Sequence, residues 1–134
     1  MGRMSELEVQ GVALGWDPDH RLLHMEFRDA RRPSELAART LAQAAARWLE
    51  DAPGPFALLV DCSRIDDTTP GWRAVWAEFF RRHKAQASVA WYNANALIRV
   101  TVLVFVKATG VRGAAFRTEA DARAWLASVG TVAP

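Results

Sequence analysis

The feature that most constrains the fold is a short, uninterrupted apolar run at 56–62, FALLVDC, in which Asp61 is the single charged residue. The run has the length of a strand, and a strand that is apolar on both faces is typical of a sheet covered by helices. The turn-forming segment PGP precedes it at 53–55, and segments with helical periodicity lie on both sides of it. This alternation of strand and helix predicts an α/β domain with a largely parallel sheet.

The N-terminal part of the chain carries the pattern of antiparallel strands. Apolar and polar residues alternate over 7–16, with a shift of phase at Gly11 that indicates a bulge in one strand. The segment DPDH at 17–20 is typical of a turn, and alternation resumes over 21–28. We therefore expect an antiparallel hairpin, which makes the sheet mixed.

Three segments have clear helical signals. A helix is expected from Pro33 and Ser34 to about Asp51, and a C-terminal helix begins near Thr118. Between them, Thr69 and Pro70 have the pattern of an N-cap followed by proline at the first helical position. The helix that follows has one aromatic-rich face, made of Trp72, Val75, Trp76, Phe79, Phe80 and His83.

The segment ALIRVTVLVFVKATG, 96–110, is ambiguous from its pattern. Its β-branched residues and a period of two favour a strand, whereas its length and a possible cap at Asn95 permit a helix. Periodicity alone does not decide between them. With strands expected at 88–92 and 112–117, the sheet has about five strands.

Composition and charge exclude several classes of function. The net charge is +2, and the basic residues form only small clusters, at 28–32 and 81–84, without a long basic stripe, so a nucleic-acid surface is not expected. No apolar stretch reaches the roughly 20 residues of a membrane span, and the N-terminus lacks a signal-peptide pattern. The lone Cys62 suits a reducing compartment, so we expect a cytoplasmic protein. The three His residues have no metal-ligand spacing, and Ser63 lacks a nucleophile-elbow motif; neither a cofactor nor catalysis is expected.

Two stretches, FALLVDCSRIDDTTPGW and FRTEADARAWL, resemble the STAS domain and, more narrowly, the SpoIIAA-like proteins. The resemblance implies one domain over 1–134 with a core at about 7–129. It implies a sheet with four helices mainly on one side, and it implies that 96–110 is helical. In the sporulation antagonists of this superfamily, a Ser in an acidic-Ser-Ser-Gly turn before a helix is phosphorylated. The similar place here holds Asp66, Asp67, Thr68, Thr69, Pro70 and Gly71, so Thr replaces Ser and a proline intervenes.

The candidate site residues follow from this turn and from the Val-rich helix. Thr68, Thr69 and Ser63 are candidate phosphorylation sites, and a phosphate on either threonine would favour the helix dipole but repel the acidic pair before it. The alternative for the threonines is a helix cap. A helix that is apolar nearly all round exposes part of its surface when it lies on a sheet, and such a patch usually marks a contact site. The candidate contact residues are Asp66, Asp67, Trp72, Leu97, Ile98, Val102 and Phe105.

We therefore expect a non-enzymatic regulatory or protein-interaction module of bacterial signalling type, for which phosphorylation at the Thr68/Thr69 turn is a candidate means of regulation. A protein partner or a second copy would bind through the third helix. The alternative is a carrier or sensor of an apolar small molecule or lipid, which requires an apolar cavity between sheet and helices.

Overall fold

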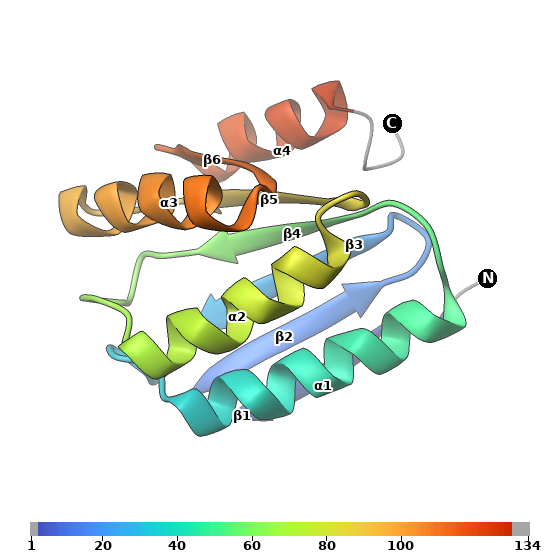
Figure 1. Cartoon of the computed structure of the whole chain (residues 1–134), viewed down its shortest axis with the longest axis horizontal. Coiled ribbons are helices and arrows are strands. Elements are labelled where there is room, and N and C mark those ends of the chain that lie inside the picture. The colour runs from blue at the N-terminus through green and yellow to red at the C-terminus, as the bar shows by residue number, and fades with distance from the viewer. Residues whose placement is uncertain (1–2, 130–134) are drawn as a thin grey trace.

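The computed structural model describes residues 3–129, which form one sheet and four helices (Figure 1). The single domain expected over 1–134 therefore includes residues 1–2 and 130–134, which lie outside the described part. The strands are β1 (Ser5–Val9), β2 (Val12–Asp17), β3 (Leu22–Phe27), β4 (Phe56–Asp61), β5 (Ala87–Tyr92) and β6 (Arg112–Phe116). The helices are α1 (Glu35–Asp51), α2 (Pro70–His83), α3 (Ala96–Thr109) and α4 (Glu119–Ser128).

The sheet is mixed, as expected, and its strands lie side by side in the order of the chain, from β1 to β6. The pairs β1–β2 and β2–β3 are antiparallel, and the pairs from β3 to β6 are parallel. The hairpin expected between 7–16 and 21–28 is the β2–β3 pair, in which Val12 lies opposite Phe27.

The expectation of about five strands was wrong, because the segment 7–16 forms two strands and not one bulged strand. Val9 pairs with Val12, so Gln10 and Gly11 form a two-residue turn. Both have positive φ angles, 49° and 81°, which is the conformation of a type I′ hairpin turn. The phase shift at Gly11 therefore marks a reversal of the chain.

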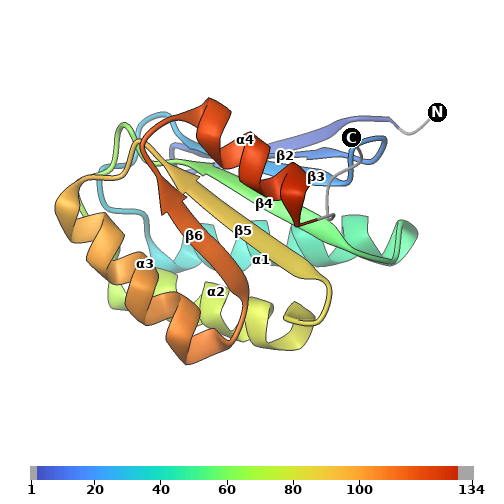
Figure 2. The same cartoon turned by 90° about the horizontal axis from the view of Figure 1, so that it is seen from above.

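The helices lie mainly on one side of the sheet. Helices α1, α2 and α3 cover one face, and α4 covers the other face over β4, β5 and β6 (Figure 2). The larger core lies under the three helices and contains the aromatic side chains of α2. The smaller core lies under α4, where Ala122 and Leu126 pack on Leu59, Ala90 and Tyr92.

The Val-rich segment is a helix, as the resemblance implied and against its β-propensity. The Asn95 side chain accepts a hydrogen bond from the Ile98 backbone N–H at 2.8 Å, which caps the first turn of α3. At the other end, Gly110 adopts a left-handed conformation, with φ of 75°, and its N–H donates to the Val106 carbonyl. The caps at Asn95 and Gly110 thus stabilise both ends of a helix whose own β-branched residues have low helix propensity. Within residues 3–129, none of the helices has the length and apolar character needed to cross a bilayer.

Candidate regulatory turn and contact surface

The turn between β4 and α2 places Thr69 as the N-cap of α2. Its hydroxyl oxygen accepts a hydrogen bond from the Trp72 N–H at 3.2 Å. The same hydroxyl donates to the Pro33 carbonyl at 2.7 Å, in the segment that leads into α1. Thr69 therefore caps α2, as its sequence pattern predicted. It also connects the start of α2 to the segment before α1 through a hydrogen bond.

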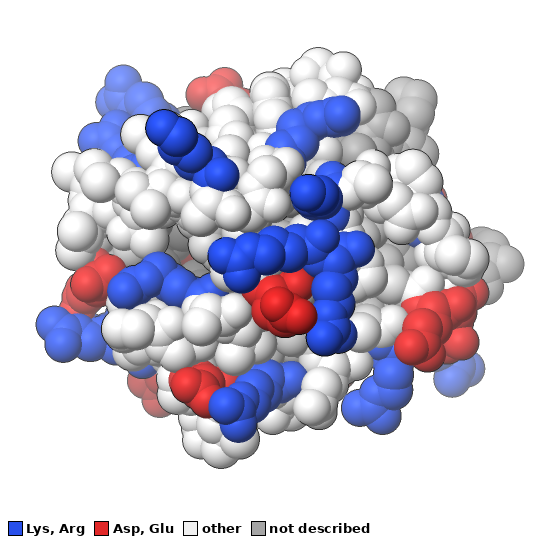
Figure 3. Space-filling model, in the orientation of Figure 1, with Lys and Arg blue, Asp and Glu red and all other residues white. Residues whose placement is uncertain are grey.

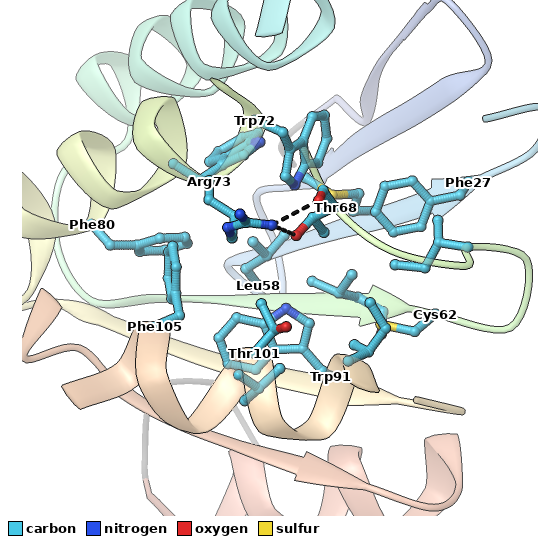
Figure 4. Close-up of a pocket in the computed structure, with 16 residues that line it drawn as sticks. Phe27, Leu58, Cys62, Thr68, Trp72, Arg73, Phe80, Trp91, Thr101 and Phe105 are labelled. Atoms are coloured by element: carbon cyan, nitrogen blue, oxygen red, sulfur yellow. Dashed lines mark hydrogen bonds between the residues drawn. The ribbon is translucent and has the colours of Figure 1, made fainter. Parts of the chain in front are cut away.

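Thr68 has a different environment, because its partner is a cation. The Arg73 Nη1 group donates both to the Thr68 hydroxyl oxygen, at 2.8 Å, and to the Thr68 carbonyl, at 2.7 Å (Figure 4). The Thr68 N–H donates to the Asp67 carboxylate at 2.7 Å. The side chain of Thr68 is half-buried, and it lies one residue before the helix cap. This hydroxyl therefore combines partial exposure with an adjacent guanidinium.

The two acidic residues of the turn differ in exposure, since Asp67 is half-buried. Asp66 is exposed, and its carboxylate lies 3.9 Å from the Arg31 guanidinium. The Asp66 carbonyl accepts a hydrogen bond from the Asn95 side chain at 3.3 Å, so the turn contacts the start of α3. Ser63 is exposed earlier in the loop, and its N–H donates to the Asp61 carboxylate. The structure thus brings Thr68, Thr69 and the acidic pair together, and Ser63 lines a shallow surface pocket with Asp66.

A small apolar cavity lies between α2, α3 and strands β3 to β5. Its volume is about 60 Å³, and its walls include Leu58, Trp72, Phe80, Trp91 and Phe105 (Figure 4). The polar residues of its lining include Thr68, Arg73 and Thr101. The cavity therefore shares Arg73 and Thr68 with the turn.

One wall of this cavity carries a buried polar atom. The Trp76 side chain is 3% exposed, and its Nε1 group has no hydrogen-bond partner within residues 3–129. Leaving such a donor without a partner costs roughly 1–3 kcal/mol. The aromatic residues of α2 lie in the core, and the sequence pattern does not reveal this unpaired donor.

The contact candidates fall into two groups in the structure. Trp72, Ile98 and Val102 are buried and line the cavity, and Phe105 is half-buried there. Leu97 is exposed on the outer side of α3. Three further apolar residues of α3 that the sequence analysis did not single out are also exposed. We call these four residues the α3 ridge, and they are exposed by 53%, 59%, 71% and 64% for Leu97, Val100, Leu103 and Val104.

Several side chains of the types used in catalysis are buried or make structural hydrogen bonds. Burial raises the pKa of the Cys62 thiol to about 12, with a smaller contribution from the Asp61 carboxylate, so the thiolate is disfavoured. The Asp61 carboxylate accepts hydrogen bonds from the Ser63 N–H and the Asn93 amide. His24 bonds to the Tyr92 hydroxyl at 3.1 Å on the other face of the sheet. Among residues 3–129 we find no cluster of three or more potential metal ligands.

The strand order, the antiparallel start and the three helices on one face define an α/β protein with a SpoIIAA-like fold, and comparison with solved structures supports this fold class. The chain is similar to an uncharacterized protein of the DUF3478 family with a SpoIIAA-like fold from Shewanella loihica PV-4. That match has a TM-score of 0.69 and 17% identity over 90% of this chain and 97% of the other.

It is also similar to apo-SiaC from Pseudomonas aeruginosa, with a TM-score of 0.60 and 15% identity over 85% of this chain and 99% of that one. Identities this low establish the fold alone. The sequence matches no known family model and no curated protein.

Proposed function

We propose that this protein is a non-enzymatic regulatory module of the cytoplasm that binds a protein partner and is switched by phosphorylation of Thr68. The observation that carries the proposal is the pair of hydrogen bonds from Arg73 to the Thr68 hydroxyl and carbonyl. A guanidinium is the group that best stabilises a phosphate through charge-assisted hydrogen bonds. The SpoIIAA-like fold supports a role in interaction, and the free, buried Cys62 suits a reducing compartment.

The three candidate hydroxyl groups differ in what a phosphate would break. At Thr69 it would remove the cap of α2 and the link to Pro33. At Thr68 it would lie at the helix N-terminus, where negative charge is favourable, and next to Arg73. Ser63 is exposed but has no cation hydrogen-bonded to its hydroxyl among the described residues. These differences favour Thr68 over Thr69 and Ser63 as the site of phosphorylation.

The expected effect of the phosphate is a rearrangement at the cavity entrance. About two negative charges on Thr68 would attract Arg73 away from the Thr68 carbonyl and repel the Asp66 and Asp67 carboxylates. Arg73 lines the cavity, and the turn contacts the start of α3 through Asn95, so both neighbouring helices would respond. Partner binding would then differ between the two forms.

The cavity does not favour the alternative function of a lipid carrier. Small-molecule sites usually enclose about 300–1,000 Å³. The cavity beneath α2 and α3 has a volume of about 60 Å³. A protein contact therefore accounts better for the exposed α3 ridge than does an enclosed apolar ligand.

Mass spectrometry of the protein purified from cells that naturally produce it tests the switch directly. Trypsin cleavage after Arg64 and Arg73 releases residues 65–73, IDDTTPGWR, which contain both threonines. Fragmentation between Thr68 and Thr69 assigns the phosphate. We expect a phosphorylated fraction with the phosphate on Thr68. Recovery of the peptide only in unmodified form under all growth conditions, or with phosphate on Thr69, would contradict the proposal.

Paired affinity purifications then test the consequence. Wild-type, Thr68→Glu and Thr68→Ala proteins serve as baits, and each must first show the wild-type circular dichroism spectrum. We expect one specific protein partner whose recovery differs between Thr68→Glu and the other two baits. If all three baits retain the same partner equally, the interaction role stands and the phosphate switch fails.

A further inference from the structure

The α3 ridge is an apolar surface with a defined charge around it. Leu97, Val100 and Val104 follow one another at helical spacing, and Leu103 widens the ridge beside them. From Leu97 to Val104 the helix advances by about 10 Å, which is two turns. The opposite side of α3, with Ile98 and Val102, already packs on the core, so the ridge is a second apolar face.

Acidic residues are scarce in the part of the chain that includes α2 and α3. Between residues 68 and 118 the sequence has a single acidic residue, Glu78, although the whole chain contains fifteen. The carboxylate of Glu78 is already paired with Arg82, at 3.1 Å. The same range holds eight of the seventeen basic residues, namely Arg73, Arg81, Arg82, Lys84, Arg99, Lys107, Arg112 and Arg117. Figure 3 shows basic side chains gathered over the middle of the helical face, with few acidic ones among them.

The entrance of the cavity lies beside the ridge. Thr101 and Phe105 are half-buried on the side of α3 that faces α2, and both line the cavity together with Arg73 of α2. A hollow between α2 and α3 is visible in Figure 3. A groove between two helices, with an apolar recess, accommodates an apolar side chain from an amphipathic helix.

From these observations we infer that the α3 ridge and the groove beside α2 bind an amphipathic helix of a partner protein, with an apolar stripe flanked by acidic residues. This inference rests on the proposed interaction role and specifies the partner's chemistry. The ridge supplies apolar contact area, and Arg99 and Lys107 at its borders supply charge complementarity.

The charges argue against a second copy of the chain as the occupant. In a two-fold symmetric contact each patch meets its own equivalent. Helix α3 contains Arg99 and Lys107 but no acidic residue, so such a contact would bring together positive charges without compensation from this helix.

The same surface is less suited to an anionic membrane. Asp66 is exposed and its backbone contacts Asn95, so an acidic group lies at the N-terminal end of α3. The ridge also lacks Trp and Tyr, the residues that are enriched at membrane interfaces. A partner with local acidic and apolar groups matches this arrangement better than a uniformly anionic layer does.

Photo-crosslinking in cells that naturally produce the protein tests the inference. Benzoylphenylalanine replaces Leu103 in one full-length variant and Leu36 in a matched control, because Leu36 is 59% exposed on α1, away from the ridge. A third variant carries the probe at Arg64, near the regulatory turn. We expect the Leu103 probe, and not the Leu36 probe, to capture a partner segment that is helical, apolar on one side and rich in Asp and Glu.

The alternatives give distinct results. Capture of another copy of the chain, of lipid, or of a segment without acidic flanks overturns the inference. Capture of a protein at Arg64 but not at Leu103 leaves the interaction role standing and rejects the α3 surface. An absence of protein capture from both positions rejects the inference and the proposed function together.

A synthetic peptide of the captured segment then tests charge and apolar contact separately. We expect Leu103→Glu to weaken peptide binding at least about tenfold, with Leu36→Glu unchanged. Lys107→Glu should also weaken it, and a peptide with its acidic residues changed to Lys should recover binding to Lys107→Glu. Thermal unfolding confirms that each variant is folded. If both peptides bind wild type and Lys107→Glu equally well, the electrostatic part of the inference is overturned. Vesicles of phosphatidylglycerol and phosphatidylcholine test the lipid alternative. If wild type binds these vesicles and Leu103→Glu does not, the ridge is a lipid-binding surface and the inference is wrong.

Discussion

At the scale of single residues, the two adjacent threonines before α2 have different roles because their hydroxyl groups face different partners. The Thr69 hydroxyl accepts a hydrogen bond from the Trp72 N–H and donates one to the Pro33 carbonyl. The Thr68 hydroxyl accepts from Arg73, whose side chain also binds the Thr68 carbonyl. Stability therefore depends more on Thr69, and a switch is better placed at Thr68.

This difference predicts unequal effects of substitution. We expect Thr69→Ala to lower the free energy of unfolding by about 1–2 kcal/mol, because it removes a helix cap and a second hydrogen bond. Thr68→Ala should cost less, since Arg73 keeps its bond to the Thr68 carbonyl. Urea unfolding followed by circular dichroism measures both. A larger loss for Thr68→Ala would contradict this division of roles.

Part of this site was predictable from residue types and spacing. Thr followed by Pro at a helix start has a local physical meaning, so the cap at Thr69 follows from sequence. The bond from Arg73 to Thr68 depends on the rotamer of a long side chain, which spacing does not specify. The unpaired Trp76 donor depends on what surrounds it in three dimensions and has no local signal.

At the scale of elements, α3 has two apolar faces with different energetic roles. Ile98 is 2% exposed in the core, and we expect Ile98→Ala to cost about 2–5 kcal/mol of unfolding free energy. Leu103 is 71% exposed, and Leu103→Ala should change the free energy of unfolding by less than about 0.5 kcal/mol. Chemical denaturation of the Ile98→Ala and Leu103→Ala variants measures both changes in the free energy of unfolding. A large cost for Leu103→Ala would mean that the ridge already stabilises the isolated fold.

The turn between β1 and β2 predicts a second contrast, between two glycines. A Cβ atom on Gly11 would overlap the Asp29 carbonyl oxygen, and the φ angle of Gly11 is positive, so Gly11→Ala requires the backbone to move. A Cβ on Gly15 would make an ordinary contact, 3.7 Å from the Ser5 carbonyl oxygen. We expect Gly11→Ala to lower the melting temperature by several degrees more than Gly15→Ala, as measured by calorimetry. Similar melting temperatures for the two variants would argue against this turn geometry.

The elements also differ in how far the sequence defines them. The central strand and α2 have unambiguous patterns, whereas an apolar alternation that changes phase at Gly11 fits a bulge and a hairpin equally well. The segment of α3 required the family resemblance, because β-branched residues compete with the caps at Asn95 and Gly110. The ridge was expected as a patch on this helix, but its members were not separable from core residues, since nearly every position is apolar.

At the scale of the whole molecule, the buried Cys62 reports on opening of the fold. Its thiol is 2% exposed and burial raises its pKa to about 12, so the reactive thiolate is scarce at pH 8 in the native state. We expect Ellman's reagent to react with native protein on the order of a thousandfold more slowly than with protein in concentrated urea. Reaction at nearly equal rates would show that the cavity beside Cys62 admits the reagent without unfolding.

The neighbour-by-neighbour strand order has a consequence for biosynthesis. Each strand pairs with the strand that precedes it in the chain, from β1 to β6. No strand therefore has to be inserted between two strands that were synthesised earlier. Such a sheet can extend at one edge while the ribosome is still translating, and few distant pairings must await the end of synthesis. We expect a ribosome-bound nascent chain that has exposed β5 to be already largely protected from protease, while α4 is still inside the exit tunnel.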